Sequence, residues 1–341
     1  MQLLPVPAGC ESGSVFHGLD QPGVAVGFLV CPPSPAHQAV VWAGSSLTAL
    51  ATLGGPDAFA YGIGHSGRIV GTAETPEMYE SGFHVTRPVV WEDGEVRDLG
   101  TLGGPIGAAT AIAPSGMIVG VCEPEAVEPS LGRRPDRACV WEKGSARDLG
   151  DLGGPEAAAL DVNARGWTVG FAMTATPYPT GDCCEEHAFL HDGQTMRDLG
   201  TVGGLASVAY SINVRGEVVG FSIPASDTGG GLPTLHAFVW REGLMRDLGT
   251  LGGAFAEAMD INDQGDIVGW SFAAAPLENW PDRAVLWHRD EAFDLNDLVP
   301  DRAGCVLTSA TAIDNAGAIL ANARCDYKQR VVLLTPVRAS R

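Results

Sequence analysis

Gly100-Thr-Leu-Gly-Gly104 is one of five copies of a phrase that recurs along the chain. The other copies are Ala51-Thr-Leu-Gly-Gly55, Gly150-Asp-Leu-Gly-Gly154, Gly200-Thr-Val-Gly-Gly204 and Gly249-Thr-Leu-Gly-Gly253. Successive copies are 49 or 50 residues apart, which indicates one supersecondary unit repeated along the chain. The residues that every repeat shares are therefore expected to build the scaffold, and function is expected in what differs between repeats.

One repeat contains four short β-strands. In the fifth repeat these strands are predicted at 207–212, 217–222, 236–240 and 244–248. Tight turns join the first strand to the second and the third to the fourth, whereas a long loop rich in Pro, Gly and Ser separates the second from the third. Four strands with two tight hairpins are what one blade of a β-propeller requires.

The number of blades follows from counting each strand. The first two strands recur seven times, with turn glycines at Gly23, Gly67, Gly116, Gly166, Gly216, Gly265 and Gly317. The fourth strand recurs only six times, because the seventh repeat ends after its third strand, and residues 2–4 have the length and apolar character to replace it. The sequence therefore predicts an all-β, seven-bladed β-propeller of four-stranded antiparallel blades. Residues 2–4 complete the last blade and close the ring, and residues 1–341 form a single domain.

The repeats also carry a tripeptide that gives a known family its name. His236-Ala-Phe238 and His187-Ala-Phe189 occur together with Asp-Leu-Gly-Thr-Leu-Gly-Gly and Ile-Asn-x-x-Gly-x-Val-Val-Gly elements. On these motifs the chain resembles the HAF-repeat family over nearly its whole length. The resemblance implies an extracellular protein, and it supplies neither an activity nor catalytic residues. The aromatic spacing of kelch repeats and the Trp-Asp ending of WD repeats are absent from the sequence.

The composition limits the partners. The 341 residues include 41 Asp and Glu against 21 Lys and Arg, a net charge of −20. Nucleic acid and anionic membranes attract cationic surfaces, so neither is expected to bind. Because Met1-Gln-Leu-Leu-Pro5 lacks the basic start and apolar core of a signal peptide, the chain is expected in the cytoplasm. A secreted protein whose signal has been removed is the alternative, and in either case we expect a monomer.

Two sets of polar residues recur at fixed positions of the repeat. The third strand begins with a long hydrogen-bond donor, and we call these residues the donor column: Gln38, Arg87, Arg137, His187, His236, Arg283 and Arg330. The fourth strand carries a carboxylate column, formed by Asp98, Asp148, Asp198, Asp247 and Asp294, with Ala49 as the exception. We expect the two columns to bond within or between blades, so that His187 and His236 have structural roles.

Binding residues are expected on one face of the propeller. The loops between the second and third strands are long and variable, at 28–36, 72–86, 121–136, 171–186, 221–235, 270–282 and 322–329. In a propeller these loops and the crossings between blades surround one mouth of the central channel. Variable loops on a rigid scaffold are where binding sites concentrate, so this long-loop face is the predicted site.

Residues that break the repeat pattern are the candidates on that face. Those that could act as acid and base, or bind a cation, are Asp57, Glu156, Glu257, Tyr61 and Tyr210. The ligand-binding candidates are His17, Tyr79, His84, Asp161, Tyr178, Asp260 and Trp280. Asp161 and Asp260 stand in a column of small residues and either line the channel or bond to a neighbouring blade. Carboxylates at a wet channel mouth are also expected without any function in so acidic a chain.

The eight cysteines predict disulfides near the ring closure. Cys10 and Cys31 are 21 residues apart and Cys305 and Cys325 are 20 apart, at equivalent positions of the first and last repeats. Two disulfides there would clamp the closure and imply an oxidising compartment; a reduced protein with coincidental spacing is the alternative. Cys139 is expected as a buried apolar residue, and Cys122 is expected near Cys183 or Cys184. Asp182-Cys-Cys-Glu-Glu-His187 lacks the spacing of a metal site.

Three functions remain open. The sequence contains no P-loop, nucleophile elbow, H-E-x-x-H motif or dinucleotide fingerprint, so no cofactor or metal is expected. A ligand-binding propeller for a small molecule, peptide or glycan is the leading hypothesis. A cofactor-independent lyase, hydrolase or cyclase with acid and base residues at the channel mouth is the alternative. A purely structural protein is disfavoured, because a closed ring with an uneven loop face does not extend into an array.

Overall fold

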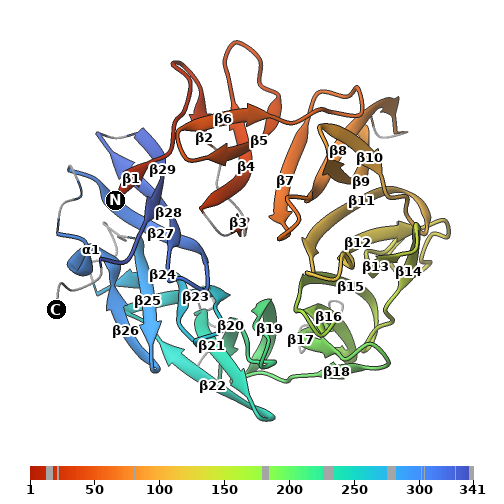
Figure 1. Cartoon of the computed structure of the whole chain (residues 1–341). Helices are drawn as coiled ribbons and strands as arrows, with labels where there is room; N and C mark the ends of the chain where they lie inside the picture. Colours follow the sequence, from red (N-terminus) through yellow and green to blue (C-terminus); the bar gives the residue numbers. More distant parts are fainter. Residues whose placement is uncertain are drawn as a thin grey trace.

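The chain folds into β-sheets arranged around a central axis, as the computed structural model shows (Figure 1). The structure describes residues 1–12, 18–20, 23–79, 82–178, 184–225, 234–274, 282–300, 302, 304–326 and 328–337. Within these ranges the only helix is the four-residue α1, Leu295–Leu298, and none of the described segments is a helix that could cross a membrane. The all-β prediction is confirmed.

The strands follow the chain in groups, and within each group neighbouring strands pair antiparallel. The first groups are β2 (Glu11–Ser12), β3 (Leu19–Asp20), β4 (Val24–Val30), β5 (His37–Ala43) and β6 (Ser46–Ala49); β7 (Ala58–Ile63), β8 (Ile69–Met78), β9 (His84–Glu92) and β10 (Glu95–Asp98); and β11 (Gly103–Ile112), β12 (Ile118–Pro124), β13 (Arg137–Glu142) and β14 (Ser145–Asp148). Then come β15 (Gly153–Val162), β16 (Thr168–Pro177), β17 (Cys184–His191) and β18 (Met196–Asp198), followed by β19 (Gly203–Ile212), β20 (Val218–Pro224), β21 (His236–Arg241) and β22 (Leu244–Gly249).

The last groups bring the two ends of the chain together. They are β23 (Gly252–Ile261), β24 (Ile267–Ala273), β25 (Asp282–His288) and β26 (Glu291–Asp294), and then β27 (Val306–Ile313), β28 (Ile319–Cys325) and β29 (Lys328–Leu334). β1 (Gln2–Leu3) lies beside β29, with Gln2 opposite Leu333 and Leu3 opposite Val332 (Figure 1). The N–H of Leu4 extends the pairing with a 2.9 Å hydrogen bond to the carbonyl of Val331. The first residues therefore supply the fourth strand of the last sheet.

The Gly-Gly phrase begins the innermost strand in four of the sheets. β15 starts at Gly153, which pairs with Thr174. The preceding side chain holds the turn, because Asp151 accepts a 2.9 Å hydrogen bond from the N–H of Gly153. A Cβ on Gly154 would stand 2.6 Å from the main chain of Met173. The second glycine is therefore required by close packing against the neighbouring strand.

Neighbouring sheets are joined by buried tryptophans as well as by apolar packing. The indole N–H of Trp91 donates to the carbonyl of Ala51 at 2.7 Å, and that of Trp141 donates to Gly100 at 2.8 Å. Each acceptor lies in the segment that leads from the preceding sheet. Because the buried Val, Ile and Ala side chains lie on both faces of each sheet, the core is a set of layers between sheets.

The donor and carboxylate columns have the structural role that the sequence predicted. Asp198 lies 2.9 Å from Nδ1 of His187, and Asp247 lies 2.7 Å from Nδ1 of His236. The hydrogen bond that His187 donates to Asp198 raises the pKa of His187. Each aspartate also accepts from the N–H of the glycine two residues later, as Asp198 does from Gly200 at 2.7 Å. These bonds explain why Asp-Leu-Gly recurs.

Candidate functional site

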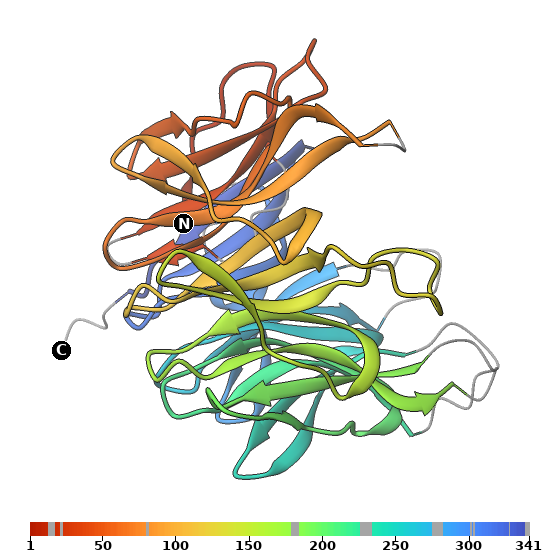
Figure 2. The same ribbon diagram turned by 90° about the vertical axis from the view of Figure 1, so that its right-hand side faces the viewer.

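The long connections between second and third strands project from one side of the molecule. Figure 2 shows this for the connections between β8 and β9, in orange, and between β12 and β13, in yellow. The connection after β12 folds back on itself, with the N–H of Glu128 bonded to the carbonyl of Arg133 at 2.9 Å. This side is the long-loop face of the sequence analysis.

Glu156 forms an ion pair on this face with a loop arginine. Glu156 is buried, with 7% of its surface exposed, and its Oε1 lies 2.7 Å from Nη1 of Arg133. The same oxygen accepts a 3.4 Å hydrogen bond from the N–H of Asp136, at the end of the loop. Desolvation and the carboxylate of Glu156 raise the pKa of Asp136, and Arg133 opposes the rise. The guanidinium of Arg133 therefore lies between carboxyl groups that repel one another.

The negative charge extends from Glu156 on both sides. Burial and the neighbouring Glu156 raise the pKa of Glu186, whose main chain pairs with Ala206 of the next sheet. On the other side, burial and Asp136 raise the pKa of Glu123. We call Glu123, Asp136, Glu156 and Glu186 the acidic cluster. The pKa values of Glu123, Asp136 and Glu186 are all raised, which is the expected response to burial and to neighbouring like charges.

Tyr210 and Glu257 are hydrogen-bonded to each other near the acidic cluster. Tyr210 is the extra residue of a β-bulge between Ala209 and Ser211. Burial, Glu257 and Glu186 all raise the pKa of Tyr210, so it donates its hydroxyl proton. Burial raises the pKa of Glu257, although hydrogen bonds with Trp270 and Tyr210 lower it. The structure therefore brings two of the sequence candidates into direct contact, and Glu186 connects them to Glu156.

Asp57 and Tyr61 lie in a different part of the face, between the sheets of β4–β6 and β7–β10. Oδ1 of Asp57 accepts from the N–H of His37 at 2.7 Å and lies 3.3 Å from its Nδ1. The His37 ring lies 4.7 Å from that of Phe59, which stacks in turn on Tyr61 at 6.2 Å. Burial raises the pKa of Tyr61 to about 12. Asp57 therefore has a histidine as its neighbour, whereas Glu156 has an arginine.

The remaining ligand-binding candidates have different neighbours, and two of them lie outside the described residues. The hydroxyl of Tyr79 bonds to Nη1 of Arg134 at 2.8 Å and so joins two neighbouring long loops. Nδ1 of His84 bonds to the carbonyl of Thr75 at 2.9 Å and closes its own hairpin. Tyr178 is half-buried directly after β16. His17 and Trp280, like Cys183, lie outside the described residues.

Asp161 and Asp260 both line the channel and bond to neighbouring sheets. Oδ2 of Asp161 accepts from the N–H of Ile212 at 2.9 Å, and Oδ2 of Asp260 accepts from Ile313 at 2.7 Å. The hydroxyl of Ser211 lies between them, 3.1 Å from Asp161 and 2.7 Å from Asp260. Burial raises the pKa of both carboxyls. Each carboxyl already accepts main-chain hydrogen bonds. Their arrangement therefore indicates that they hold neighbouring sheets together rather than bind a ligand.

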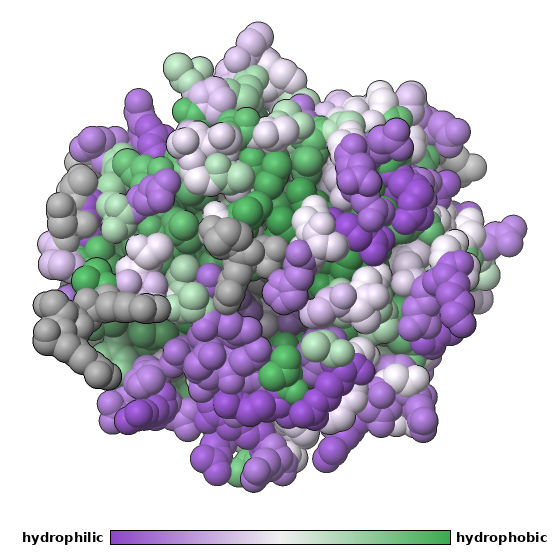
Figure 3. All heavy atoms as spheres, in the orientation of Figure 1, coloured by the Kyte–Doolittle hydropathy of each residue, from purple (hydrophilic) through white to green (hydrophobic). Residues whose placement is uncertain are grey.

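These two aspartates border the end of the channel that carries the short turns. They line a cavity of about 80 Å³ in the channel and a second of about 230 Å³ that also contacts Asn163, Asn213 and Asn262 of those turns. Figure 3 shows that hydrophilic side chains gather on the face drawn there over the sheets of β15–β26. The sequence analysis placed Asp161 and Asp260 with the long-loop candidates, whereas their polar neighbours are the turns of the opposite face.

Sequence reasoning missed Asp136, Glu186 and Arg133. Asp136 and Glu186 stand directly before the donor column, where the other repeats have His37, Thr86, Leu235, Asp282 and Gln329. That position faces the second residue after the Gly-Gly phrase at the start of the next group of strands, as the pairs Asp136–Glu156 and Glu186–Ala206 show. Comparison of this position between repeats would have found both carboxylates. No sequence signal indicated that Arg133 would turn toward Glu156.

The described residues form three disulfides. Cys10–Cys31 and Cys305–Cys325 join residues whose Cα atoms are 4.1 and 4.2 Å apart, and both pairings were predicted. The third joins Cys122 to Cys139 across β12 and β13, with Cα atoms 6.1 Å apart. The predictions that Cys139 is a simple apolar residue and that Cys122 meets Cys183 or Cys184 are therefore wrong. Three such pairs indicate an oxidising environment, and the cytoplasmic expectation is not supported.

The described residues contain no group of three His, Cys, Asp or Glu side chains placed to hold a metal ion. Within the same ranges, Glu123, Glu156 and Glu186 of the acidic cluster lie on three different strands, and Arg133 forms an ion pair with Glu156. What the cluster can do is bind a positively charged group through charge-assisted hydrogen bonds.

The fold resembles that of known propellers. No protein-family model matches the chain, and no curated protein matches it in sequence. The β-propeller domain of the trilobed protease from Pyrococcus furiosus, described as having an open velcro topology, aligns with a TM-score of 0.61 and 9% identity over 95% of each chain. The acylaminoacyl peptidase of Pyrococcus horikoshii aligns with a TM-score of 0.51 and 12% identity, over 81% of this chain and 44% of that one. The likeness shows the fold, a β-propeller.

Proposed function

We propose that the chain is a seven-bladed propeller of HAF-type repeats that works in an oxidising, extracytoplasmic compartment and binds a ligand on its long-loop face. The pairing of β1 with β29 supports closure of the ring by residues 2–4. The three disulfides support the compartment. The concentration of carboxyl groups on one face supports the site, because scattered solubilising charges would avoid one another.

The ligand is a small molecule or peptide that carries a guanidinium or amine. The contact of Arg133 with Glu156, 2.7 Å from nitrogen to oxygen, is the observation that carries this choice. Arg133 comes from a loop and keeps 56% of its side chain exposed, whereas Glu156 keeps 9%. The guanidinium of an exposed loop residue is thus held by a buried carboxylate. A cationic ligand would enter the same surroundings and relieve the repulsion that, together with burial, raises the pKa of Asp136 and Glu186.

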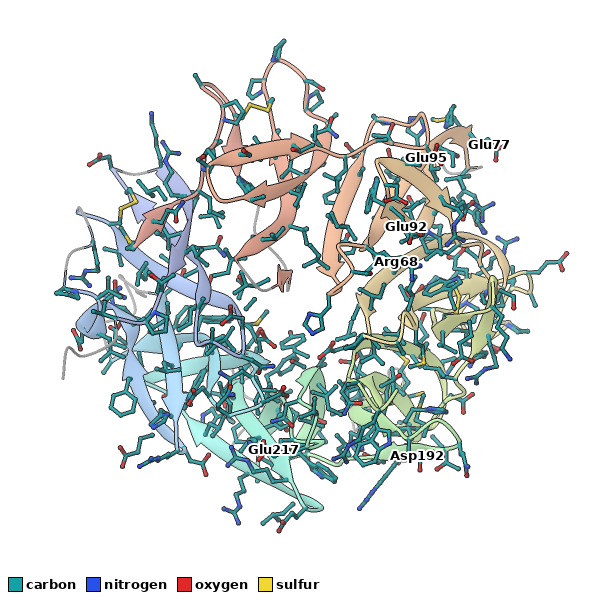
Figure 4. All side chains as sticks on the ribbon, viewed as in Figure 1. Arg68, Glu77, Glu92, Glu95, Asp192 and Glu217 are labelled. Atoms are coloured by element: carbon teal, nitrogen blue, oxygen red, sulfur yellow. A yellow bond between two sulfur atoms is a disulfide. The ribbon has the colours of Figure 1, made fainter. Side chains whose placement is uncertain are left out.

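Calorimetric titration tests this proposal with defined probes. The probes are spermidine, an arginine-rich hexapeptide, its glutamate-rich counterpart and a neutral oligosaccharide. We expect saturable binding of the cationic probes only, weakened about tenfold or more by Glu186→Gln. Glu95→Gln is the matched control, because Glu95 is exposed on β10 of another sheet (Figure 4). Equal affinity in Glu186→Gln and in the native protein, or binding of the neutral probe alone, would contradict the proposal.

The Tyr210–Glu257 pair favours the enzyme alternative. A neutral tyrosine that donates to a carboxylate is suited to transfer a proton to or from a bound substrate. If the protein is an enzyme, Tyr210→Phe should remove turnover while binding persists, and Glu257→Gln should do the same. Chromogenic esters and glycosides provide the first assay. Turnover that is unchanged in both variants would exclude this pair as the catalytic residues.

A further inference from the structure

The last sheet departs from the pairing of the donor and carboxylate columns. In the sheet of β7–β10, Asp98 stands opposite Val89, and Nε of Arg87 lies 3.5 Å from its Oδ2. The same geometry recurs where Asp294 stands opposite Val285, with Nε of Arg283 3.4 Å from its Oδ2. The donor thus stands two residues before the partner of the carboxylate.

Two sheets lack the carboxylate, and they differ in the donor. Ala49 stands opposite Val40, and there the donor is the uncharged Gln38, which bonds to the carbonyl of Leu50 at 2.8 Å. Leu3 stands opposite Val332, and there the donor is the charged Arg330. Nη1 of Arg330 donates to the carbonyl of its neighbour Gln329 at 3.0 Å. In the described part of the chain Arg330 forms no ion pair.

A cavity of about 720 Å³ lies where the carboxylate is missing. Its polar wall is Lys328, Gln329 and Arg330 at the start of β29. Its apolar wall is the segment from Leu3 to Cys10, in which Leu3 is 47% exposed. The disulfide of Cys10 with Cys31 and the hydrogen bond from its N–H to the carbonyl of Pro7 hold that segment in place. Two cations and a preformed apolar wall therefore meet at the edge of the last sheet.

We propose that this cavity binds an organic carboxylate on an aliphatic chain. The carboxylate takes the position of the missing aspartate and receives hydrogen bonds from the guanidinium of Arg330, with Lys328 adding charge. The aliphatic chain lies along Leu3, Val6 and Pro7, where it removes exposed apolar surface from water. In a protein with a net charge of −20, an anion is attracted only where cations gather. The site is separate from the acidic cluster, which selects the opposite charge.

Calorimetric titration of the native protein with octanoate tests the proposal. Octanamide, which has the same chain without the charge, and inorganic phosphate, which has charge without the chain, are the comparison probes. We expect saturable binding of octanoate, with octanamide and phosphate each weaker by about tenfold or more. Octanamide or phosphate binding as tightly as octanoate, or no saturable binding of octanoate, would overturn the assignment.

Two substitutions locate the site. Arg330→Gln reproduces the arrangement of Gln38 and should weaken the binding of octanoate by about tenfold or more. Leu3→Asp restores the column's ion pair, so it should exclude octanoate and raise the melting temperature. Because Leu3→Asp is expected to stabilise, it remains informative if Arg330→Gln folds poorly. Arg283→Gln, whose native partner is Asp294, is the control and should bind octanoate normally. Unchanged octanoate affinity in Leu3→Asp would overturn the proposal.

Discussion

The side-chain amide of Asn163 donates a 2.9 Å hydrogen bond to the main-chain carbonyl of Asn213, fifty residues further along the chain. Asn213 donates in the same way to Asn262 at 3.1 Å, and Asn262 donates to Asp314 at 3.2 Å. Side-chain amides one repeat apart therefore form a series of hydrogen bonds between successive repeats, which we call the amide ladder.

Asn163→Asp should separate the two roles of this residue. Oδ1 of Asn163 accepts from the N–H groups of Arg165 and Trp167 within its turn, and an aspartate keeps that acceptor. It loses the amide donor, which leaves the buried carbonyl of Asn213 without its partner. We expect a loss of about 1–3 kcal/mol in the free energy of unfolding, measured with urea. Asn163→Ala removes both roles and should lower the free energy of unfolding further. Equal losses in the two variants would contradict a separate stabilising role for the hydrogen bond to Asn213.

The repeat predicted the scaffold well because backbone geometry depends on local residues. The turn that begins at Gly153, the bonds between the donor and carboxylate columns and the Oδ1 acceptors of the turn asparagines each lie within one sheet, so their pattern is visible in every repeat of the chain. The contacts that depend on strand register or on the packing of neighbouring sheets were predicted less well. Cys122 pairs with Cys139 across adjacent strands, and this pairing depends on register. Glu156, Tyr210 and Glu257 were found because they break the pattern, whereas Asp136 and Glu186 stood at a position that was assigned to variable loops.

Glu186→Gln should stabilise the protein in a pH-dependent manner. Burial and Glu156 raise the folded-state pKa of Glu186 above its ordinary value of 4.5, so between the two pKa values the native state binds more protons than the unfolded state. Stability therefore falls as the pH rises through this window. We expect a higher melting temperature for Glu186→Gln than for the native protein at pH 7. The difference should disappear at pH 4 and below, and Glu95→Gln should show no such dependence.

The disulfides should be reduced in a definite order. Cys122 and Cys139 are fully buried, at 0% exposure each, whereas Cys10 and Cys31 are both partly exposed. Under native conditions a reductant should therefore open Cys10–Cys31 first and Cys122–Cys139 last. Alkylation with mass spectrometry at successive times measures the order. Early alkylation of Cys122 would contradict this order.

Replacing Cys305 and Cys325 together by Ala should lower the free energy of unfolding by about 3 kcal/mol.

Gly154→Ala should be strongly destabilising because of contact rather than backbone conformation. The added methyl group would lie 2.6 Å from the main-chain carbonyl of Met173, and that strand cannot move without disturbing its sheet. We expect a loss of about 2 kcal/mol or more. Gly44→Ala is the control: Gly44 has φ of 61° and nothing within 4 Å of an added Cβ, so its cost should be about 1 kcal/mol. Chemical denaturation of the two variants measures the difference.

Arg133→Ala should strengthen the binding of a cationic ligand if the acidic cluster is the site. In the native protein an incoming guanidinium competes with Arg133 for Glu156. Removing that side chain leaves Glu156 and Asp136 without their internal cation, so spermidine or an arginine-rich peptide should bind more tightly at low salt, and the gain should shrink as salt is added. Arg97→Ala is the control, since Arg97 is exposed on β10 of another sheet. Weaker binding in Arg133→Ala would mean that this arginine helps to hold the ligand, and would contradict the competition.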